Sequence, residues 1–265
     1  MYRQIRIHEE DWNFQRILWF NQDERIVTYQ LTTVTYGLAC VPFLALRTLN
    51  QLIEDEGANF PLAIPSLKDG RYVDDIFGGA NLISQAQAIV EQLTFLCKAG
   101  GSPLQKCISN HPAILGSIPS EQQAKSTSIQ FEDSTMIHVL GLCWNSLSDT
   151  FQFSVASSIQ STVTKRIILS TIAKVFDPLG LLAPVTITAK IIMQELWSIK
   201  LGWDNPLPLS TSKKWIQFME LLQDISKLNF PRWISLQSGR EVEIHGFCDA
   251  SQLCHICCYL RSIIE

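Results

Sequence analysis

The sequence has little charge, and it lacks an excess of basic residues. Asp, Glu, Lys and Arg together make up 17% of the 265 residues, and the formal net charge at pH 7 is −4. This balance argues against a free-standing basic nucleic-acid module. The charge is also uneven, because residues 1–158 hold 10 basic and 16 acidic side chains, whereas the remainder holds 11 and 9. The second part is therefore the better electrostatic candidate for a contact with nucleic acid.

Uninterrupted apolar runs of membrane-spanning length are missing as well. Residues 167–199 form the most apolar region, and it is broken by charged residues and prolines, namely Lys174, Asp177, Pro178, Pro184 and Lys190. The first ten residues have no apolar core of a secretion signal. The sequence therefore predicts no membrane association.

The eight cysteines lack the pattern of a disulfide framework. In a long chain without a secretion signal they are expected to be reduced thiols. Cys254 and Cys257 are separated by two residues and have His245 and Cys248 nearby, which leaves a zinc site as an alternative. The spacing does not match a two-knuckle zinc site, and the segment is typical of an apolar strand.

What the sequence does contain is globular material of mixed secondary structure. Apolar residues make up 46%, and the length is enough for one large or two small domains. Residues 12–36 and 138–154 favour strand–turn–strand units, and residues 42–53 and 82–97 have helical spacing. Helices are then expected at 165–176, 184–199 and 212–228, and strands at 242–249 and 254–260. The pattern predicts an α+β chain in which a sheet packed by helices is followed by a helical region and a new sheet.

Residues 71–79 carry the most informative local pattern. Two adjacent acids, Asp74 and Asp75, stand between short apolar or aromatic runs and are followed by two glycines. This pattern is typical of a tight hairpin that presents two carboxylates at its tip, where their repulsion requires a cation or water. A solvated Asp-Asp turn is the alternative interpretation.

The Tyr-Val-Asp-Asp motif at residues 72–75 is one of several motifs that occur in a definite order. The others lie at residues 1–5 with 14–19, 35–45, 98–101, 139–144, 174–184 and 245–251. Together they cover nearly the whole chain. In this order they resemble the reverse transcriptase region of a Bel/Pao-type long-terminal-repeat retrotransposon polyprotein, running into the start of RNase H. The resemblance implies a partial palm with an antiparallel sheet at 1–158, a helical thumb or connection region at 159–238, and the first strands of an RNase H-like fold at 239–265.

This resemblance implies an RNA-directed DNA polymerase that transfers nucleotides with two Mg²⁺ ions. Asp74 would be a metal ligand and Asp75 the auxiliary carboxylate, which suits the oxygen ligands that Mg²⁺ prefers. The implied partners are an RNA or DNA primer–template, a deoxynucleoside triphosphate and the rest of the polyprotein. The implied location is the cytoplasm, in a virus-like particle.

The resemblance also assigns roles outside the acidic hairpin. Tyr2 falls where an aromatic ring lies under the incoming sugar, and its alternative is a plain strand aromatic. Gly37 lines the nucleotide site, and Tyr36 stands where the related retroviral pattern has Gln, which puts the nucleotide contact there in doubt. The remaining implied residues are Lys106 at the triphosphate, with a solvated strand lysine as the alternative, Leu140 and Gly141 in the primer grip, and Asp249 as the first RNase H carboxylate.

The sequence departs from the family pattern in ways that bear on activity. The first catalytic aspartate of the family would precede Met1, and the later RNase H carboxylates would follow Glu265, so we expect weak Mg²⁺ binding and no activity of this chain alone. A non-catalytic copy that binds nucleic acid or a protein is the alternative. An aspartic peptidase is disfavoured because no Asp-Ser/Thr-Gly turn is found, the nearest sequences being those that begin at Asp177 and Asp249.

Overall fold

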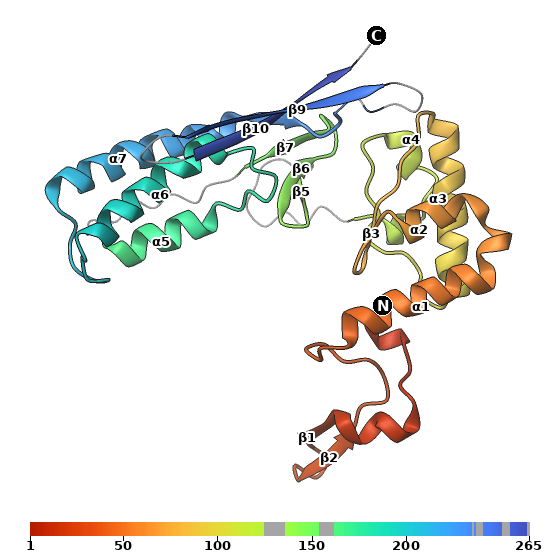
Figure 1. The fold of residues 1–265 in the computed structure, drawn as a ribbon. Coiled ribbons are helices and arrows are strands. Elements are labelled where there is room, and N and C mark those ends of the chain that lie inside the picture. Colours follow the sequence, from red (N-terminus) through yellow and green to blue (C-terminus); the bar gives the residue numbers. More distant parts are fainter. Residues whose placement is uncertain (125–135, 154–161, 235, 237–240, 251–254, 264–265) are drawn as a thin grey trace. The chain divides into compact units, whose positions relative to one another are not determined.

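A computed structural model describes residues 1–124, 136–153, 162–234, 236, 241–250 and 255–263 (Figure 1). The chain divides into two compact units, residues 1–125 and 126–265. Helices and strands both contribute, so the chain is α+β as the sequence predicts. The finer division at residues 158 and 238 stays a prediction.

The strands of the first unit form two separate two-stranded antiparallel sheets. β1 (Arg16–Phe20) pairs with β2 (Ile26–Gln30), and β3 (Arg71–Tyr72) pairs with β4 (Asp75–Ile76). The strand expected to begin at Trp12 begins only at Arg16, because residues 9–15 form a 3₁₀ helix in which Trp12 Nε1 donates to the Ile7 carbonyl at 3.0 Å. A continuous palm sheet therefore stays a prediction.

Helices supply the core of the first unit. They are α1 (Val41–Glu56), α2 (Ile64–Lys68), α3 (Ile83–Ala99) and α4 (Pro112–Leu115). Buried side chains from α1, α2, α3 and the 3₁₀ turn before α2 meet in one cluster, namely Leu49, Ala63, Leu67, Leu93, Leu96 and Cys97. As predicted, α3 ends at Gly100 and Gly101. Gly101 has a left-handed φ of +68°, which glycine adopts without steric cost. Ile76, in β4 of the acidic hairpin, packs against this cluster.

The second unit begins with a four-stranded antiparallel sheet. Its order is β5 (Met136–Val139), β6 (Leu142–Asn145), β7 (Thr150–Gln152) and β8 (Asn229–Pro231). The hairpin predicted over residues 138–154 is confirmed in its β6–β7 half. The single strand expected over residues 138–144 is wrong, because the backbone reverses at Leu140 and Gly141 and makes a second hairpin there.

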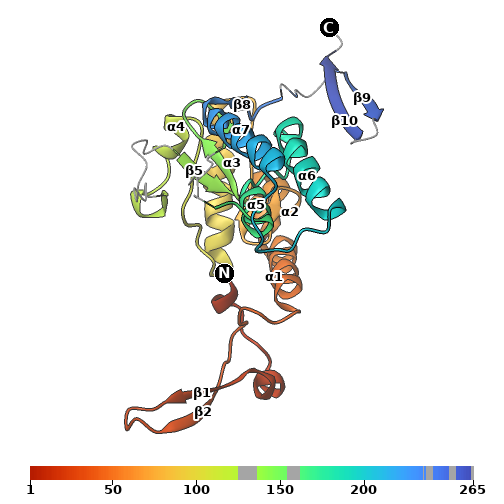
Figure 2. The ribbon, with the colours of Figure 1, turned by 90° about the vertical axis from the view of Figure 1, so that its left-hand side faces the viewer.

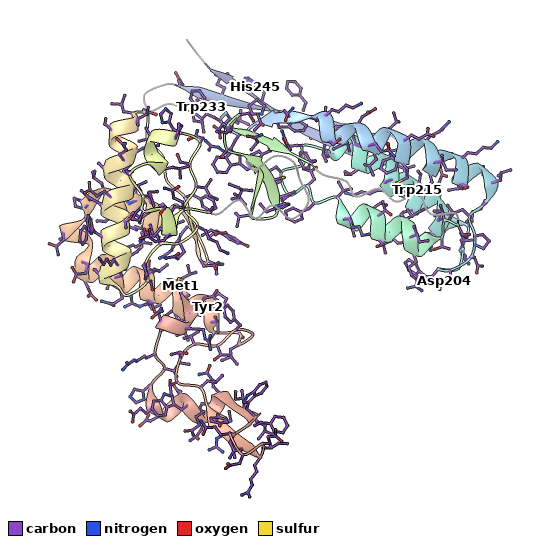
Figure 3. All side chains as sticks on the ribbon, turned by 180° about the vertical axis from the view of Figure 1, so that it is seen from behind. Met1, Tyr2, Asp204, Trp215, Trp233 and His245 are labelled. Atoms are coloured by element: carbon purple, nitrogen blue, oxygen red, sulfur yellow. The ribbon has the colours of Figure 1, made fainter. Side chains whose placement is uncertain are left out.

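Three helices pack beside this sheet, as predicted, although the third begins at Leu209 and ends at Gln223 and not at the expected residues 212 and 228. They are α5 (Lys165–Lys174), α6 (Ala183–Ser198) and α7 (Leu209–Gln223), followed by a 3₁₀ turn at Asp224–Lys227 (Figure 2). Their buried side chains form one core with the sheet, namely Leu142, Phe153, Ile168, Leu182, Ala189, Ile192, Met193, Leu196, Trp215, Phe218, Met219, Leu222 and Ile225. Trp215 on α7, labelled in Figure 3, is the largest of them.

The chain continues into a long two-stranded hairpin. β9 (Val242–Ala250) pairs antiparallel with β10 (His255–Ile263), in a register that sets Val242 opposite Ile263 and Ala250 opposite His255. Both strands were predicted from the sequence. Short 3₁₀ turns complete the described elements, at Tyr2–Gln4, Gly57–Asn59, Pro61–Ala63 and Ser120–Gln122. Within the described residues no helix has the length and apolar character needed to cross a membrane.

Candidate metal and nucleotide site

The acidic hairpin predicted from the sequence is present. Tyr72 pairs with Asp75, which leaves Val73 and Asp74 as the two residues of the loop. Val73 has a φ of +55°, a left-handed conformation that is rare for a β-branched residue. Tight hairpin loops that require a positive φ at this place usually have glycine there. The loop is therefore strained where it presents Asp74.

One contact with a helix and one backbone hydrogen bond across its base anchor this hairpin. Arg71 Nη2 donates to Asn50 Oδ1 of α1 at 2.6 Å, and the Phe77 amide donates to the Gly70 carbonyl at 2.5 Å. A Cβ at Gly70 would stand 2.2 Å from the Phe77 carbonyl oxygen, so only glycine fits this close crossing. The base of the hairpin is fixed while its tip is free to meet a ligand.

Both carboxylates are exposed, but only Asp74 lies in the loop; Asp75 is the first residue of β4, so the expectation that both acids stand at the tip is correct for Asp74 alone. In the described part of the chain, no group of three or more His, Cys, Asp or Glu side chains is arranged to hold a metal ion. Two neighbouring carboxylates with open positions for water suit Mg²⁺, which keeps several of its waters and uses one or two protein carboxylates. The residue types at Asp74 and Asp75 are thus ones that Mg²⁺ uses, and binding of the ion by this chain stays a prediction.

Tyr2, Tyr36 and Asp74 come together, although they are far apart in the sequence. The rings of Tyr2 and Tyr36 are in edge-to-face contact, with centroids 5.0 Å apart and planes inclined by 70°. Desolvation, the nearby carboxylate of Asp74 and the phenol of Tyr36 raise the pKa of Tyr2 above its ordinary value. Figure 3 labels Tyr2 at the start of the chain. Tyr2 and Tyr36 thus touch, and Asp74 is near enough for its charge to act on the Tyr2 phenol; these three residues are called the cluster below.

Backbone pairing explains how the N-terminal turn reaches Tyr36. The Ile7 amide donates to the Thr32 carbonyl and the Val34 amide donates to the Ile5 carbonyl, each at 3.0 Å. These bonds hold residues 5–7 beside residues 32–34. Tyr2 and Tyr36 therefore lie at the same end of this short antiparallel pairing. Gly37 follows with a φ of +93°, a conformation that side-chain-bearing residues rarely adopt.

Lys106 follows α3 in an irregular segment. It is exposed and has a φ of +57°, so it is not the strand residue that the alternative interpretation assumed. The next residue, Cys107, makes an isolated bridge with Gln123. The role of Lys106 at a triphosphate stays a prediction.

Leu140 and Gly141 form the tip of the β5–β6 hairpin in the second unit. Val139 pairs with Leu142, and the two loop residues have φ values of +49° and +84°. Positive φ at both loop positions is typical of a type I′ turn, whose twist matches that of the flanking strands. Leu140 is 43% exposed. The tight hairpin implied for the primer grip is thus present as a local structure, and its contact with a primer stays a prediction.

Asp249 lies near the end of β9, opposite Ile256 of β10. The placement of its side chain, and that of Cys254, is outside the described residues, so the RNase H carboxylate and the zinc alternative both stay untested. The five cysteines whose side chains are described, Cys40, Cys97, Cys107, Cys143 and Cys248, are free.

Sequence reasoning missed two contacts that shape these sites. Asn50 holds Arg71, and the ring of Phe176 lies against Gly141, where a Cβ would approach its Cε1 atom to 2.6 Å. Asn50 lies among helical residues that show no sign of a distant partner. Phe176 belongs to a motif of the resemblance, at residues 174–184, to which no function was given.

Comparison with known families gives one match. The profile of the Pao retrotransposon-like RNaseH-like domain matches residues 164–265, from the residue that caps α5 to the last residue of the sequence. No curated protein matches the chain. The matched region lies wholly in the second unit and contains α5, α6, α7 and the β9–β10 hairpin.

Proposed function

Since this chain belongs to a Pao retrotransposon polyprotein by its residues 164–265, we propose that the Asp74–Asp75 hairpin is the metal site of an RNA-directed DNA polymerase. The observation that supports this most is the cluster of Tyr2, Tyr36 and Asp74. A solvated acidic turn needs no aromatic neighbours, whereas a nucleotide site uses a ring against the sugar beside a metal-binding carboxylate.

The residues of the cluster and their neighbours Asp75 and Gly37 each have a role in the proposed reaction. Asp74 and Asp75 would hold Mg²⁺, which when bound stabilises the charge that develops on the oxygens of a transferring phosphoryl group. The ring of Tyr2 would lie under the sugar, and Tyr36 would hold that ring from its edge. Gly37 would let the backbone approach the nucleotide, because it carries no Cβ.

The proposed partners are a primer–template of RNA or DNA, a deoxynucleoside triphosphate and the rest of the polyprotein. We propose that Mg²⁺ binding by this chain is weak, because its site offers two carboxylates and both are exposed to solvent. Nucleotide transfer by this chain alone would then be slow or absent. Detectable Mg²⁺-dependent primer extension by the purified chain would contradict this part of the proposal.

The metal site can be tested without activity. Mn²⁺, which binds the same oxygen ligands as Mg²⁺, would broaden the amide NMR signals of residues 72–76. Asp74→Asn should remove most of this broadening. Asp69→Asn is the matched control, since Asp69 is an exposed carboxylate that ends α2 two residues before the hairpin. Broadening that is absent from the hairpin, or equal in both variants, would overturn the assignment.

A non-catalytic nucleic-acid binding module is the second candidate. It is favoured by the charge of the chain after residue 158, where basic residues outnumber acidic ones. Binding to an RNA–DNA duplex that weakens steeply with salt, without any response to Asp74→Asn and without primer extension, would favour this candidate.

A further inference from the structure

We propose that Phe176 is a positioning residue that holds the Leu140–Gly141 turn in the shape needed to contact a primer strand. The inference rests on the proposed function, because the turn has a ligand only if the chain binds a primer–template. It gives a role to a residue of the motif at 174–184, which nothing else in the site explains. The residues involved all belong to the second unit.

The first observation is the contact between the ring and the turn. Gly141 has a φ of +84°, and a Cβ built on it would lie 2.6 Å from Cε1, 3.0 Å from Cδ1 and 3.2 Å from Cζ of Phe176. One edge of the ring therefore occupies the space that any other residue at position 141 would fill. The turn accepts the ring because Gly141 is glycine, and the ring in turn limits how far the loop can move.

The second observation is that the segment carrying Phe176 is itself fixed. Both carboxylate oxygens of Asp177 accept backbone hydrogen bonds, from the Leu181 amide at 2.9 Å and from the Leu182 amide at 2.7 Å. Leu182 is 1% exposed and belongs to the core of the second unit, so Asp177 ties the loop to the start of α6. On the other side, the Val175 amide donates to the Ile172 carbonyl of α5 at 3.1 Å. Phe176 is thus held between two helices.

The third observation concerns exposure. The Phe176 side chain is 52% exposed, so it is not a core residue, and its burial alone contributes only a part of what a fully buried ring contributes. Leu179 lies in the same loop, is 57% exposed and has no place in the core cluster. The two residues have similar exposure and differ in the contact with Gly141. Leu179 is therefore the matched control for Phe176.

These observations define how Phe176 would act. Two-residue turns with positive φ are stiff, but the turn at Leu140 contains a residue that tolerates this conformation poorly. A ring packed on the adjacent glycine opposes rearrangement of the loop. The backbone that would meet the primer end then has one shape before binding, which lowers the entropic cost of binding. Phe176 acts through the turn and needs no contact of its own with nucleic acid.

Two measurements on the full chain test the proposal. Amide hydrogen exchange of residues 140–142 reports whether the ring holds the turn, and the anisotropy of a labelled primer–template duplex reports affinity. Phe176→Ala should speed exchange at the turn and weaken duplex binding, each by about tenfold, the ratio that corresponds to one lost packing contact. Phe176→Tyr should keep the exchange rate and the duplex affinity of the unaltered chain, and Leu179→Ala should change neither quantity.

The outcomes separate this inference from the proposed function. Unchanged exchange at residues 140–142 in Phe176→Ala would overturn the inference. Faster exchange with unchanged duplex affinity would overturn the role in primer contact. If the unaltered chain fails to bind duplex, the proposed function fails and takes the primer role with it, while the exchange data still decide whether the ring holds the turn.

Discussion

Tyr2 meets Tyr36 edge to face across 34 residues of sequence, with ring centroids 5.0 Å apart. The contact joins the segment that precedes the β1–β2 hairpin to the segment that follows it. Residues 5–7 of the first segment pair with residues 32–34 of the second. Tyr36 is 70% exposed, so the contact is made at the surface beside Asp74. Ring geometry of this kind is favourable beyond the area it buries.

A double-mutant cycle should measure this ring contact. Tyr2→Ala, Tyr36→Ala and the double variant should give a coupling free energy of about 0.5 kcal/mol by urea unfolding, at the low end for aromatic pairs because the rings are exposed. The control cycle pairs Tyr2 with Tyr72, which lies in β3 and is 61% exposed. Equal coupling in the two cycles would show that the edge-to-face contact contributes nothing.

Val73 should be replaceable by glycine at little cost or with a gain. A left-handed conformation costs a residue with a side chain about 1–2 kcal/mol, and glycine relieves this cost while losing about 0.5–1 kcal/mol through the freedom of the unfolded chain. Val73→Gly should therefore raise the free energy of unfolding by up to about 1 kcal/mol. Val27→Gly, in β2 opposite Trp19, should lower it, because that position has ordinary strand geometry. A lower urea midpoint for Val73→Gly would contradict the strain.

Asp149 should stabilise the second unit more than other surface acids do. Its carboxylate accepts from Arg232 Nε at 2.6 Å and Nη2 at 2.9 Å, and also from Trp144 Nε1 at 3.0 Å. The Asp149 side chain is 23% exposed, so solvent screens this fork only in part. Asp149→Asn should lower the free energy of unfolding by about 1 kcal/mol, and asparagine keeps the left-handed φ of +53° accessible.

Asp204 provides the comparison for Asp149. Arg166 donates to Asp204, which is labelled in Figure 3, in the same forked geometry, at 2.8 and 3.0 Å, but both side chains are mostly exposed. Asp204→Asn should leave the urea midpoint unchanged, because water and salt screen an exposed ion pair. An effect as large as that of Asp149→Asn would show that exposure does not decide the contribution of these pairs.

Local patterns predicted most of the elements, and the contacts between distant segments were beyond them. Apolar spacing found α3, and the glycines after Ala99 marked its end. The same reasoning overlooked the reversal at Leu140, because an apolar run with one glycine is typical of an unbroken strand. Only the resemblance implied a tight hairpin at this place, and the register that sets Val139 opposite Leu142 shows it.

The cluster at the acidic hairpin shows the same division. The residue types and their order pointed to Tyr2, Tyr36 and Asp74 separately. Their meeting depends on the pairing of residues 5–7 with 32–34 and on the anchoring of Arg71 by Asn50, and neither leaves a periodic pattern. The strain at Val73 was also hidden, since a valine that follows a tyrosine is ordinary in a strand and its positive φ leaves no mark in the sequence.

Cys97 should make the stability of the chain fall at alkaline pH. Burial in the core of the first unit, with a smaller contribution from Cys107, raises the pKa of its thiol from 9.0 to about 11. The folded state therefore holds the proton more tightly than the unfolded state, and this contribution is present in full below about pH 9 and is lost as pH rises through about 11. A shift of this size corresponds to about 3 kcal/mol.

The measurement is the free energy of unfolding as a function of pH, from about pH 8 to about pH 11, because thiols titrate in this range. Cys97→Ala should lose the steepest part of the decline, because alanine has no proton to release on unfolding. Cys40→Ala is the control, since Cys40 is exposed and its thiol is solvated in both states. Parallel pH profiles for the unaltered chain and Cys97→Ala would contradict the prediction. Iodoacetamide gives an independent check, because only the thiolate reacts, and Cys97 should resist alkylation at pH 8 until the chain unfolds.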